Sequence, residues 1–383
     1  MAVVWIPSQD QILNSNLKKF TDLVSKNTGK KFKSYDELHD FSISNPEFWQ
    51  FLIEFCGVIG EWKGPIYEGE NILSAKWFPQ SKLNFAENML KNRSDDEALI
   101  FRCEDRISET LSFAELYNQV SKTAQHLREL GVNKGDRVAG FLPNFAGSIV
   151  AMLATVSVGA IWSSCSPDFG EQGVIDRFGQ IEPKVLFCVD GYFYNGTSHN
   201  CLDKIKSFTA KLPTLEQVVI FDYAPLNNIS INNSISYQEI LNNYKPNIIE
   251  FERVSFDHPL YIMYSSGTTG VPKCIVHGHG GTLVQHLKEH QLQTNISSGD
   301  RVFYFTTCSW MMWNWLVSAL GTGATIMLYD GSPTHPDNTV LWKFAEEEQF
   351  THFGTSAKYI ETIMKNNVNP SSSFKLTNLK AIC

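Results

Sequence analysis

The sequence predicts an α/β fold in which layered sheets are flanked by helices. Short β-branched and aromatic runs at 138–142 and 185–189 alternate with segments of helical spacing at 113–130 and 173–181. Alternation of this kind favours a sheet with helices on its faces. The chain has 383 residues, of which 43% are hydrophobic, so it can bury a substantial core.

Aromatic residues separated by polar stretches characterise the first hundred residues, as at Trp5, Trp49, Trp62 and Trp77. This pattern indicates a mixed, loop-rich segment. The helix predicted over 113–130 ends at Gly131, because glycine readily adopts the left-handed conformation that closes a helix.

A stretch without charged residues, 138–167, could be mistaken for a membrane span. The positions of proline and glycine within it predict a buried β-α-β unit instead. After the strand at 138–142, Pro143 opens a helix, Gly159 closes it, and a second apolar run begins at 160–163.

The second unit contains a helix over 173–181, a break at Pro183 and a strand over 185–189. Asparagine, serine and isoleucine then dominate 226–244, which predicts a surface excursion rather than core. Near the end, a helix is predicted over 356–366, and 379–383 begins like a strand. A strand needs a partner and a following turn, so we expect the chain to be truncated.

Composition excludes several classes of protein. A formal charge of −8, a pI near 5.7 and the absence of a basic run argue against a nucleic-acid-binding protein. Eight cysteines without a C-x-x-C pair fit neither a zinc module nor a dense disulfide framework, and favour a reducing compartment. The first residues do not form a secretory signal, so we expect a cytosolic protein.

The strongest chemical signal is a small-residue segment between two apolar runs, 260–264 and 274–277. We expect it to form a loop between two strands, with 261–264 buried. Glycines let backbone N–H groups converge on an anion, hydroxyls add donors, and a lysine adds charge. It is not a Walker A loop, because Pro272 precedes the lysine and a strand follows. The predicted ATP phosphate-binding residues are Ser265, Ser266, Gly267, Thr268, Thr269, Gly270 and Lys273.

Two other patterns have competing interpretations. His286 and His290 form an H-x-x-E-H pattern typical of zinc proteases, but a third ligand is not evident downstream. We therefore expect a solvated helix face. Cys308 invites a nucleophile hypothesis, yet no histidine lies beside it in the sequence.

The segment 265–273 matches the signature of AMP-forming adenylating enzymes. Segments 45–49, 77–78 and 83–84 resemble the N-terminal extension of short-chain acyl-CoA synthetases. Within that family, several segments look like the acetoacetyl-CoA synthetase branch: 161–170, 176–178, 181–184, 310–315 and 328–333.

This resemblance implies the fold of the large N-terminal domain of adenylate-forming enzymes, truncated. Residues 1–95 would be the N-terminal extension and 96–383 an incomplete AMP-binding domain, with the small C-terminal domain absent. The implied reaction is ATP-dependent activation of acetoacetate to acetoacetyl-CoA through an acyl-adenylate. It uses ATP, Mg²⁺ and coenzyme A and involves neither nucleic acid nor membrane. The oligomeric state stays open.

The resemblance also implies an acyl pocket formed by Trp310, Met311, Met312, Trp313 and Asn314. Methionine adapts to its ligand, and an asparagine can hydrogen-bond a keto oxygen. No catalytic residue and no metal ligand is assigned within this chain, because the adenine, ribose and adenylation-lysine segments are expected beyond it. No arginines match the coenzyme A site around 190–199.

Two alternatives remain. The chain could be a non-enzymatic truncated product, which by itself would make little or no acyl-CoA and would be poorly stable. It could also be an acetyl- or propionyl-CoA synthetase.

Overall fold

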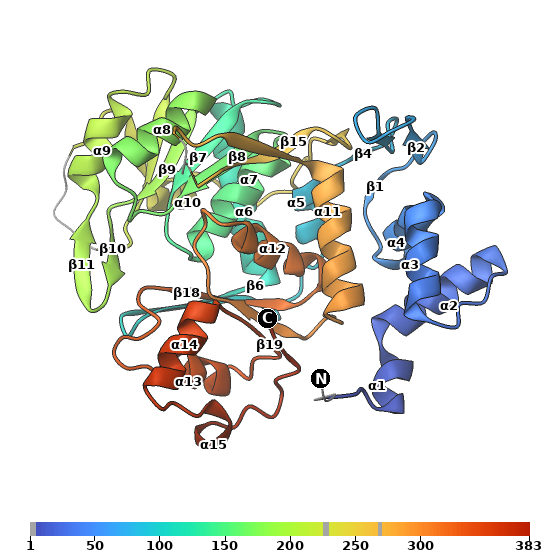
Figure 1. Cartoon of the computed structure of the whole chain (residues 1–383). Coiled ribbons are helices and arrows are strands. Elements are labelled where there is room, and N and C mark those ends of the chain that lie inside the picture. Colours follow the sequence, from blue (N-terminus) through green and yellow to red (C-terminus); the bar gives the residue numbers. More distant parts are fainter. Residues whose placement is uncertain (1–4, 225–229, 267–269) are drawn as a thin grey trace.

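Two mostly parallel sheets organise the chain (Figure 1). The computed structural model describes residues 5–224, 230–266 and 270–383. The first sheet is parallel except for its last strand, in the order β13 (Ser234–Ser236), β12 (Gln217–Phe221), β9 (Val185–Val189), β7 (Arg137–Phe141), β8 (Ile161–Cys165), β15 (Pro259–Tyr264) and β16 (Cys274–Gly278). The second is parallel except for β6, in the order β20 (Ala381–Ile382), β19 (His352–Gly354), β17 (Arg301–Tyr304), β18 (Thr325–Asp330), β5 (Glu97–Cys103) and β6 (Ile107–Ser112). The predicted α/β class is confirmed.

The predicted β-α-β unit is confirmed as β7, helix α7 (Ala146–Ser157) and β8. Every residue of α7 is buried, since the helix packs against β7 and β8 of the first sheet and β5 of the second. This location explains why the segment lacks charges. In the described part of the chain, no helix has the length and apolar character that crossing a membrane requires.

Other predicted elements are also found. Helix α6 (Phe113–Glu129) begins with a capping box between Ser112 and Glu115. Further along are α8 (Glu171–Ile181) and α14 (Ala357–Lys365). The last predicted strand is the two-residue β20, where Cys383 N donates to Phe353 O at 3.0 Å.

Two predictions need correction. Four helices occupy much of the segment expected to be loop-rich, namely α1 (Gln9–Asn14), α2 (Asn16–Thr28), α3 (Tyr35–Ser44) and α4 (Glu47–Phe55). Helices α2, α3 and α4 each bury an aromatic residue, and Phe20 packs against Phe48. The expected surface excursion supplies edge strand β13 and helix α10 (Tyr237–Asn243), whose Ile240 is fully buried. Residues 225–229 lie outside the described residues.

Smaller elements complete the fold. Asn84 anchors the N-terminal segment, because its buried side-chain amide donates to Val156 O and Glu252 O, both at 2.8 Å. The remaining elements are β1 (Gly60–Glu61), β2 (Tyr67–Glu68), β3 (Lys76–Trp77), β4 (Lys82–Leu83), α5 (Phe85–Met89), β10 (Gly191–Tyr194), β11 (Thr197–Asn200), α9 (Leu202–Thr209), β14 (Val254–Ser255), α11 (His279–Lys288), a π turn (Glu289–Gln293), α12 (Met311–Ser318), a 3₁₀ turn (Ala319–Thr322), α13 (Val340–Glu347) and α15 (Pro370–Ser373).

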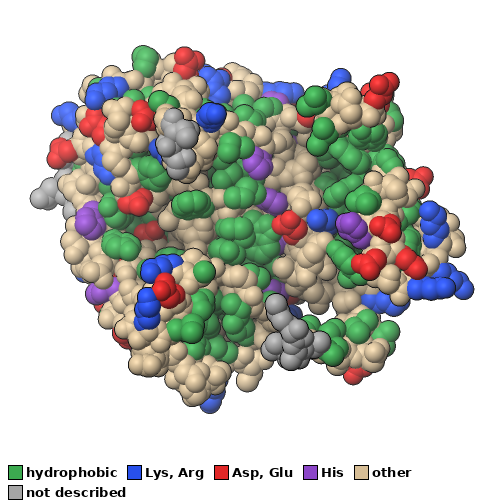
Figure 2. All heavy atoms as spheres, in the orientation of Figure 1, with side chains coloured by type: hydrophobic (Ala, Val, Ile, Leu, Met, Phe, Trp, Pro, Cys, Tyr) green, Lys and Arg blue, Asp and Glu red, His purple; other side chains and the backbone are tan. Residues whose placement is uncertain are grey.

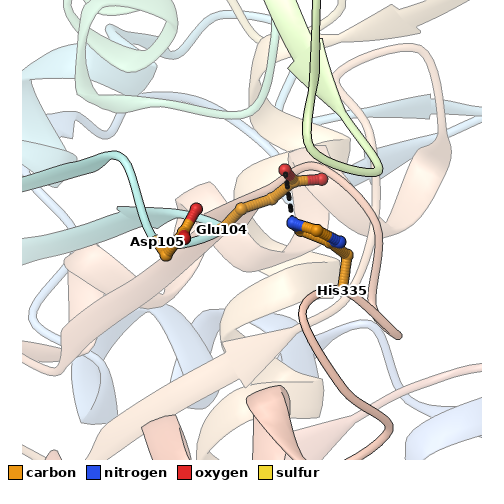
Figure 3. Close-up of side chains that lie close together, drawn as sticks. All are labelled: Glu104, Asp105 and His335. Carbon is orange, nitrogen blue, oxygen red and sulfur yellow. Dashed lines mark ion pairs between the residues drawn. The ribbon is translucent and has the colours of Figure 1, made fainter.

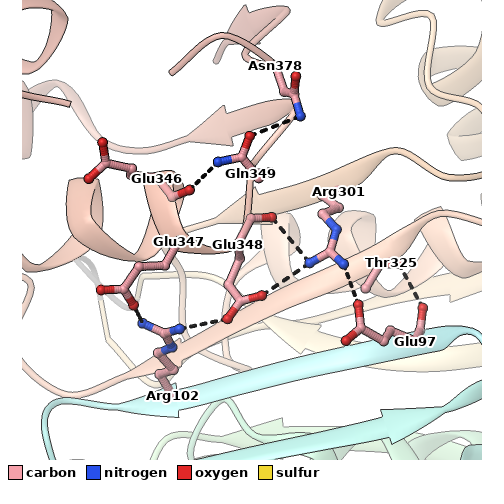
Figure 4. Close-up of polar contacts among 9 residues, drawn as sticks. All are labelled: Glu97, Arg102, Arg301, Thr325, Glu346, Glu347, Glu348, Gln349 and Asn378. Atoms are coloured by element: carbon pink, nitrogen blue, oxygen red, sulfur yellow. Dashed lines mark hydrogen bonds and ion pairs between the residues drawn. The ribbon is translucent and has the colours of Figure 1, made fainter. Parts of the chain in front are cut away.

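A network of ion pairs joins the second sheet to α13 (Figure 4). Arg102 on β5 contacts Glu347 and Glu348, and Arg301 on β17 contacts Glu348 at 3.2 Å. Arg301 also pairs with Glu97. Because all these side chains are partly exposed, the network fixes the position of α13 more than it adds to stability.

Asp330 is the last residue of β18, and its side chain contacts residues that follow strands β7 and β12 of the first sheet. Its carboxylate accepts from Tyr223 Oη at 3.1 Å and from Asn144 N at 3.4 Å. Burial of this carboxyl group raises its pKa to about 7. A raised pKa in the folded state means that the group favours folding below pH 4, and that this contribution is lost as pH rises through 7.

We therefore expect Asp330→Asn to gain stability relative to the original chain as pH rises from 4 to 8. The gain should be on the order of 4 kcal/mol, measured by urea unfolding. Asp337→Asn is the control, because Lys343 lowers the pKa of Asp337 to about 2 and its difference from the original chain should stay flat over this range. A flat difference for Asp330→Asn would contradict the prediction.

Candidate functional site

The predicted phosphate loop joins β15 to β16, as expected, in its described residues 265–266 and 270–273. Its two ends are bonded to each other: Ser265 N donates to Lys273 O at 3.0 Å, and Lys273 N donates to Ser265 Oγ at 2.9 Å. This closure holds the start and end of the loop together. The predicted site residues Gly267, Thr268 and Thr269 lie outside the described residues.

The accessible part of the loop carries the residues expected to meet an anion. Ser266, Gly270 and Lys273 are exposed, and Gly270 has a φ of 141°, which a residue with a side chain rarely adopts. Gln180 on α8 supports the loop by donating to Pro272 O at 2.8 Å. Among the described residues, Lys273 forms no ion pair, so its ammonium group is free to meet a ligand.

Burial of the preceding strand is less complete than predicted. Tyr261 is buried, but 262–264 are half-buried. The reason is that β16 is an edge strand whose Ile275 and Val276 are exposed, so one face of this hairpin is open.

Beside that open face lies a cavity of about 500 Å³. Figure 2 shows hydrophobic side chains and histidines gathered over this part of the molecule. Strand β16, helix α11 with its π turn, and the start of α12 supply the lining residues Val276, His277, Gly278, Gly281, Thr282, Gln285, His286, Glu289, Met311, Met312 and Trp315. The cavity is largely apolar with a few polar groups, a composition typical of small-molecule sites.

The structure divides the five predicted pocket residues. Met311 and Met312 line the cavity and are half-buried. Trp310 is 67% exposed and is not among the lining residues. Trp313 and Asn314 point into the core: Trp313 Nε1 donates to Asn144 Oδ1 at 3.0 Å, and Asn314 Nδ2 lies 3.7 Å from Met263 Sδ.

The expectation of a solvated helix face at His286 and His290 is wrong. Both imidazoles are buried, with 3% and 0% exposure, and both contact Ser318 on α12. The distances to Ser318 Oγ are 2.9 Å from His286 Nδ1 and 2.8 Å from His290 Nε2. Burial lowers the pKa of each histidine to about 3, so both are neutral at pH 7.

Sequence reasoning also missed Gln285, Glu289 and Trp315 as lining residues. The available signal was the helix that follows the phosphate loop, because a helix there faces the same edge of the sheet. A π turn begins at Glu289, and such turns are frequent at functional sites.

A second cluster of titratable groups, Glu104, Asp105 and His335, lies at the tip of the β10–β11 hairpin (Figure 3). The Glu104 carboxylate accepts three backbone N–H bonds, from Asn195 at 2.6 Å and from Gly196 and Ser332 at 2.9 Å each. These bonds occupy the oxygens that a cation would need. The cluster is therefore a structural junction between two loops.

Cys308 is buried, and its Sγ donates to Leu142 O at 2.8 Å. Burial raises the pKa of its thiol far above the ordinary value, so the thiolate is disfavoured. Cys308 therefore lacks the features of a nucleophile.

Comparison with known proteins extends this description. Residues 85–382 match the family model described as AMP-binding enzyme. The chain is 47% identical over 381 residues to the acetoacetyl-coenzyme A synthetase of Rhizobium meliloti, covering 98% of this chain and 58% of that protein. It is 41% identical over 395 residues to the acetoacetyl-CoA synthetase of Gallus gallus, covering 99% and 59%.

The fold is also shared with a solved structure, the acetoacetyl-CoA synthetase from Streptomyces lividans. The TM-score is 0.94 at 39% identity, over 99% of this chain and 59% of that one. The chain thus spans less than two thirds of the length of these relatives.

We expect Ser318→Ala to lower the free energy of unfolding by about 1–3 kcal/mol, because two buried imidazoles lose their shared partner. Ser157→Ala is the matched control: its equally buried hydroxyl makes one bond, to Ala154 O at 2.7 Å, and we expect a loss of about 0.5–1 kcal/mol. Urea unfolding at pH 7 measures both. Equal losses would show that the histidines do not depend on Ser318.

Proposed function

Because the chain belongs to the AMP-binding enzyme family, we propose that it forms part of an ATP-dependent ligase that converts acetoacetate to acetoacetyl-CoA. The similarity to proteins named acetoacetyl-CoA synthetase supports this proposal, since it extends over 98–99% of the chain. The cavity beside the phosphate loop is the structural observation that supports it best. The activity belongs to the whole protein, of which this sequence covers about 58% in its relatives.

The proposed reaction has two steps. First, a carboxylate oxygen of the acid attacks the α-phosphorus of ATP, the bond to the bridging oxygen breaks, and pyrophosphate leaves. The thiolate sulfur of coenzyme A then attacks the acyl carbon, and AMP leaves with its phosphate oxygen.

Two anions meet in the first step, so the residues of the chain serve mainly to position them and offset their repulsion. The loop N–H groups, the hydroxyls of Ser265 and Ser266, and the ammonium group of Lys273 would contact the phosphates. Thr268 and Thr269 are proposed for the same role on their sequence alone. Mg²⁺ would enter with the nucleotide as its counter-ion.

We propose that the acyl group lies in the cavity between β16 and α12. Met311 and Met312 would limit its length from one side, and α11 would line the other. The long side chains of Met311 and Met312 leave little room for a long acyl chain. They therefore favour a small acid with a polar group over a long fatty acid. An acetyl- or propionyl-CoA synthetase remains the second candidate, and the similarity of the whole chain to acetoacetyl-CoA synthetases disfavours it.

In this proposal, residues 1–95 are an extension and 96–383 are part of the AMP-binding domain. The helices α1 to α4 precede the family match at residue 85, which supports a boundary in this region. A cytosolic location fits the reducing environment expected for eight free cysteines.

Removing the lysine at the end of the loop tests the phosphate site. We expect Lys273→Ala to weaken ATP binding about tenfold, because a charge-assisted hydrogen bond to phosphate is lost. Titration with a fluorescent ATP analogue at constant ionic strength measures it. The control Lys358→Ala alters an exposed lysine that pairs with Glu361, and it should bind like the original chain. Equal affinities in both variants would count against the site.

Enlarging the cavity tests the acyl pocket. We expect Met312→Ala to raise the ratio of kcat/KM for hexanoate to that for acetoacetate roughly tenfold, since space for extra methylenes is created. ATP–pyrophosphate exchange measures this ratio in a chimera that carries the C-terminal remainder of the Rhizobium meliloti relative. Met364→Ala, at a 70% exposed methionine, should leave the ratio unchanged. No shift for Met312→Ala would place the acyl group elsewhere.

A further inference from the structure

The hydrogen-bond network behind the cavity leaves one ring nitrogen of the buried His286 without a described hydrogen-bond partner. His286 is 3% exposed and lines the cavity, and its Nδ1 lies 2.9 Å from Ser318 Oγ. Its other ring nitrogen, Nε2, has no hydrogen-bond partner among the described residues, and it is not one of the enclosed atoms. The atom is therefore reachable from the cavity.

The neighbouring histidine has a fixed tautomer. His290 Nε2 lies 2.9 Å from Trp315 O and 2.8 Å from Ser318 Oγ. A carbonyl oxygen can only accept, so His290 Nε2 carries the proton and donates. His290 Nδ1 then carries no proton, and it is enclosed without a hydrogen-bond partner in the described part of the chain.

Ser318 can direct its hydroxyl proton in two ways. When it donates to Trp315 O, at 2.6 Å, His286 Nδ1–H donates to Ser318 and His286 Nε2 becomes an acceptor toward the cavity. When it donates to His286 Nδ1 instead, Trp315 O still receives the His290 proton, and His286 Nε2–H becomes a donor. Rotation of the Ser318 hydroxyl, together with the tautomer of His286, thus decides whether His286 Nε2 offers a ligand a hydrogen-bond donor or an acceptor.

Three other polar side chains of the cavity already have a hydrogen-bond partner or are only half-buried. Gln285 Nε2 donates to Glu289 Oε1 at 2.7 Å, and Glu289 Oε2 accepts from Trp315 Nε1 at 3.0 Å. His277 is half-buried and stacks on Tyr261, with ring centroids 5.1 Å apart. A ligand oxygen gains little from a group that water already reaches, and more from a buried one.

We propose that His286 is a specificity-determining residue that hydrogen-bonds the oxygen on the third carbon of the acid. This inference rests on the proposed function and deepens it, because it assigns the substrate class to small acids with a 3-oxo or 3-hydroxy group. Nε2–H donates to a keto oxygen, and bare Nε2 accepts from a hydroxyl. Met311 and Met312 then contact the carbon atoms, and the network behind His286 sets the identity of the polar group.

Calorimetry on the full chain with MgATP tests the proposal by comparing acetoacetate, 3-hydroxybutyrate and butyrate. Acetoacetate should bind about tenfold more tightly than butyrate, which corresponds to one net hydrogen bond, and 3-hydroxybutyrate should bind within about threefold of acetoacetate. His286→Leu should bring the ratio of acetoacetate to butyrate affinity near one while butyrate still binds.

Two further variants separate recognition from folding. His286→Gln keeps an amide donor and should retain a preference of several-fold. Ser318→Ala keeps the ring but removes its partner, and should reduce the preference about twofold to fivefold. His39→Gln, at an exposed histidine of α3 outside the cavity, should keep the preference of the original chain.

Retention of the preference in His286→Leu would overturn the proposal. If His286→Leu does not fold, an unchanged preference in both His286→Gln and Ser318→Ala would overturn it. ATP–pyrophosphate exchange in the chimera that carries the C-terminal remainder of the Rhizobium meliloti relative distinguishes the proposed role of His286 from the proposed function. Exchange without discrimination between acetoacetate and butyrate would refute the role of His286 and leave the proposed function standing, whereas neither binding nor exchange with any of the acids would refute both.

Discussion

The buried side chain of Asn144 holds together the part of the molecule on which the site depends. It follows β7 of the first sheet, and its amide donates to Thr306 O and Tyr329 O of the second sheet, both at 3.3 Å. Its oxygen accepts from Trp313 Nε1. The carboxyl ends of strands from two sheets therefore meet at one residue, which also fixes helix α12. Met311 and Met312 begin the same helix, so this contact also helps to place them beside the cavity.

Charge is distributed around the site according to burial. The loop that would meet the phosphates keeps Lys273 exposed, where an ammonium group retains its hydration until a ligand arrives. Behind the cavity, burial lowers the pKa of His286 and His290, so both imidazoles are neutral at pH 7. They interact with their surroundings through hydrogen bonds rather than through charge. Glu104 can remain buried because three backbone N–H groups satisfy it. The chain thus separates a charged surface at the loop from a largely apolar pocket at α12.

The H-x-x-E-H segment illustrates why spacing alone misled the functional interpretation. One helical turn between two histidines is compatible with a metal site, a solvated face or a buried network. Ser318, more than twenty residues further along the chain, decides among them, because it contacts both rings. The partial burial of 262–264 has a similar origin, since it depends on which strand lies at the edge of the sheet.

Local patterns in the sequence determined the fold class, the β-α-β unit around α7, helices α6, α8 and α14, and the loop between β15 and β16. These features follow from periodicity, helix caps and glycine or proline breaks, which act over a few residues. The tertiary structure alone decided which side chains share a cavity. It separated Met311 and Met312 from Trp313 and Asn314, and it brought α11 against α12. Pairing across the chain depends on packing of two sheets and a buried helix, and no window of sequence contains that information.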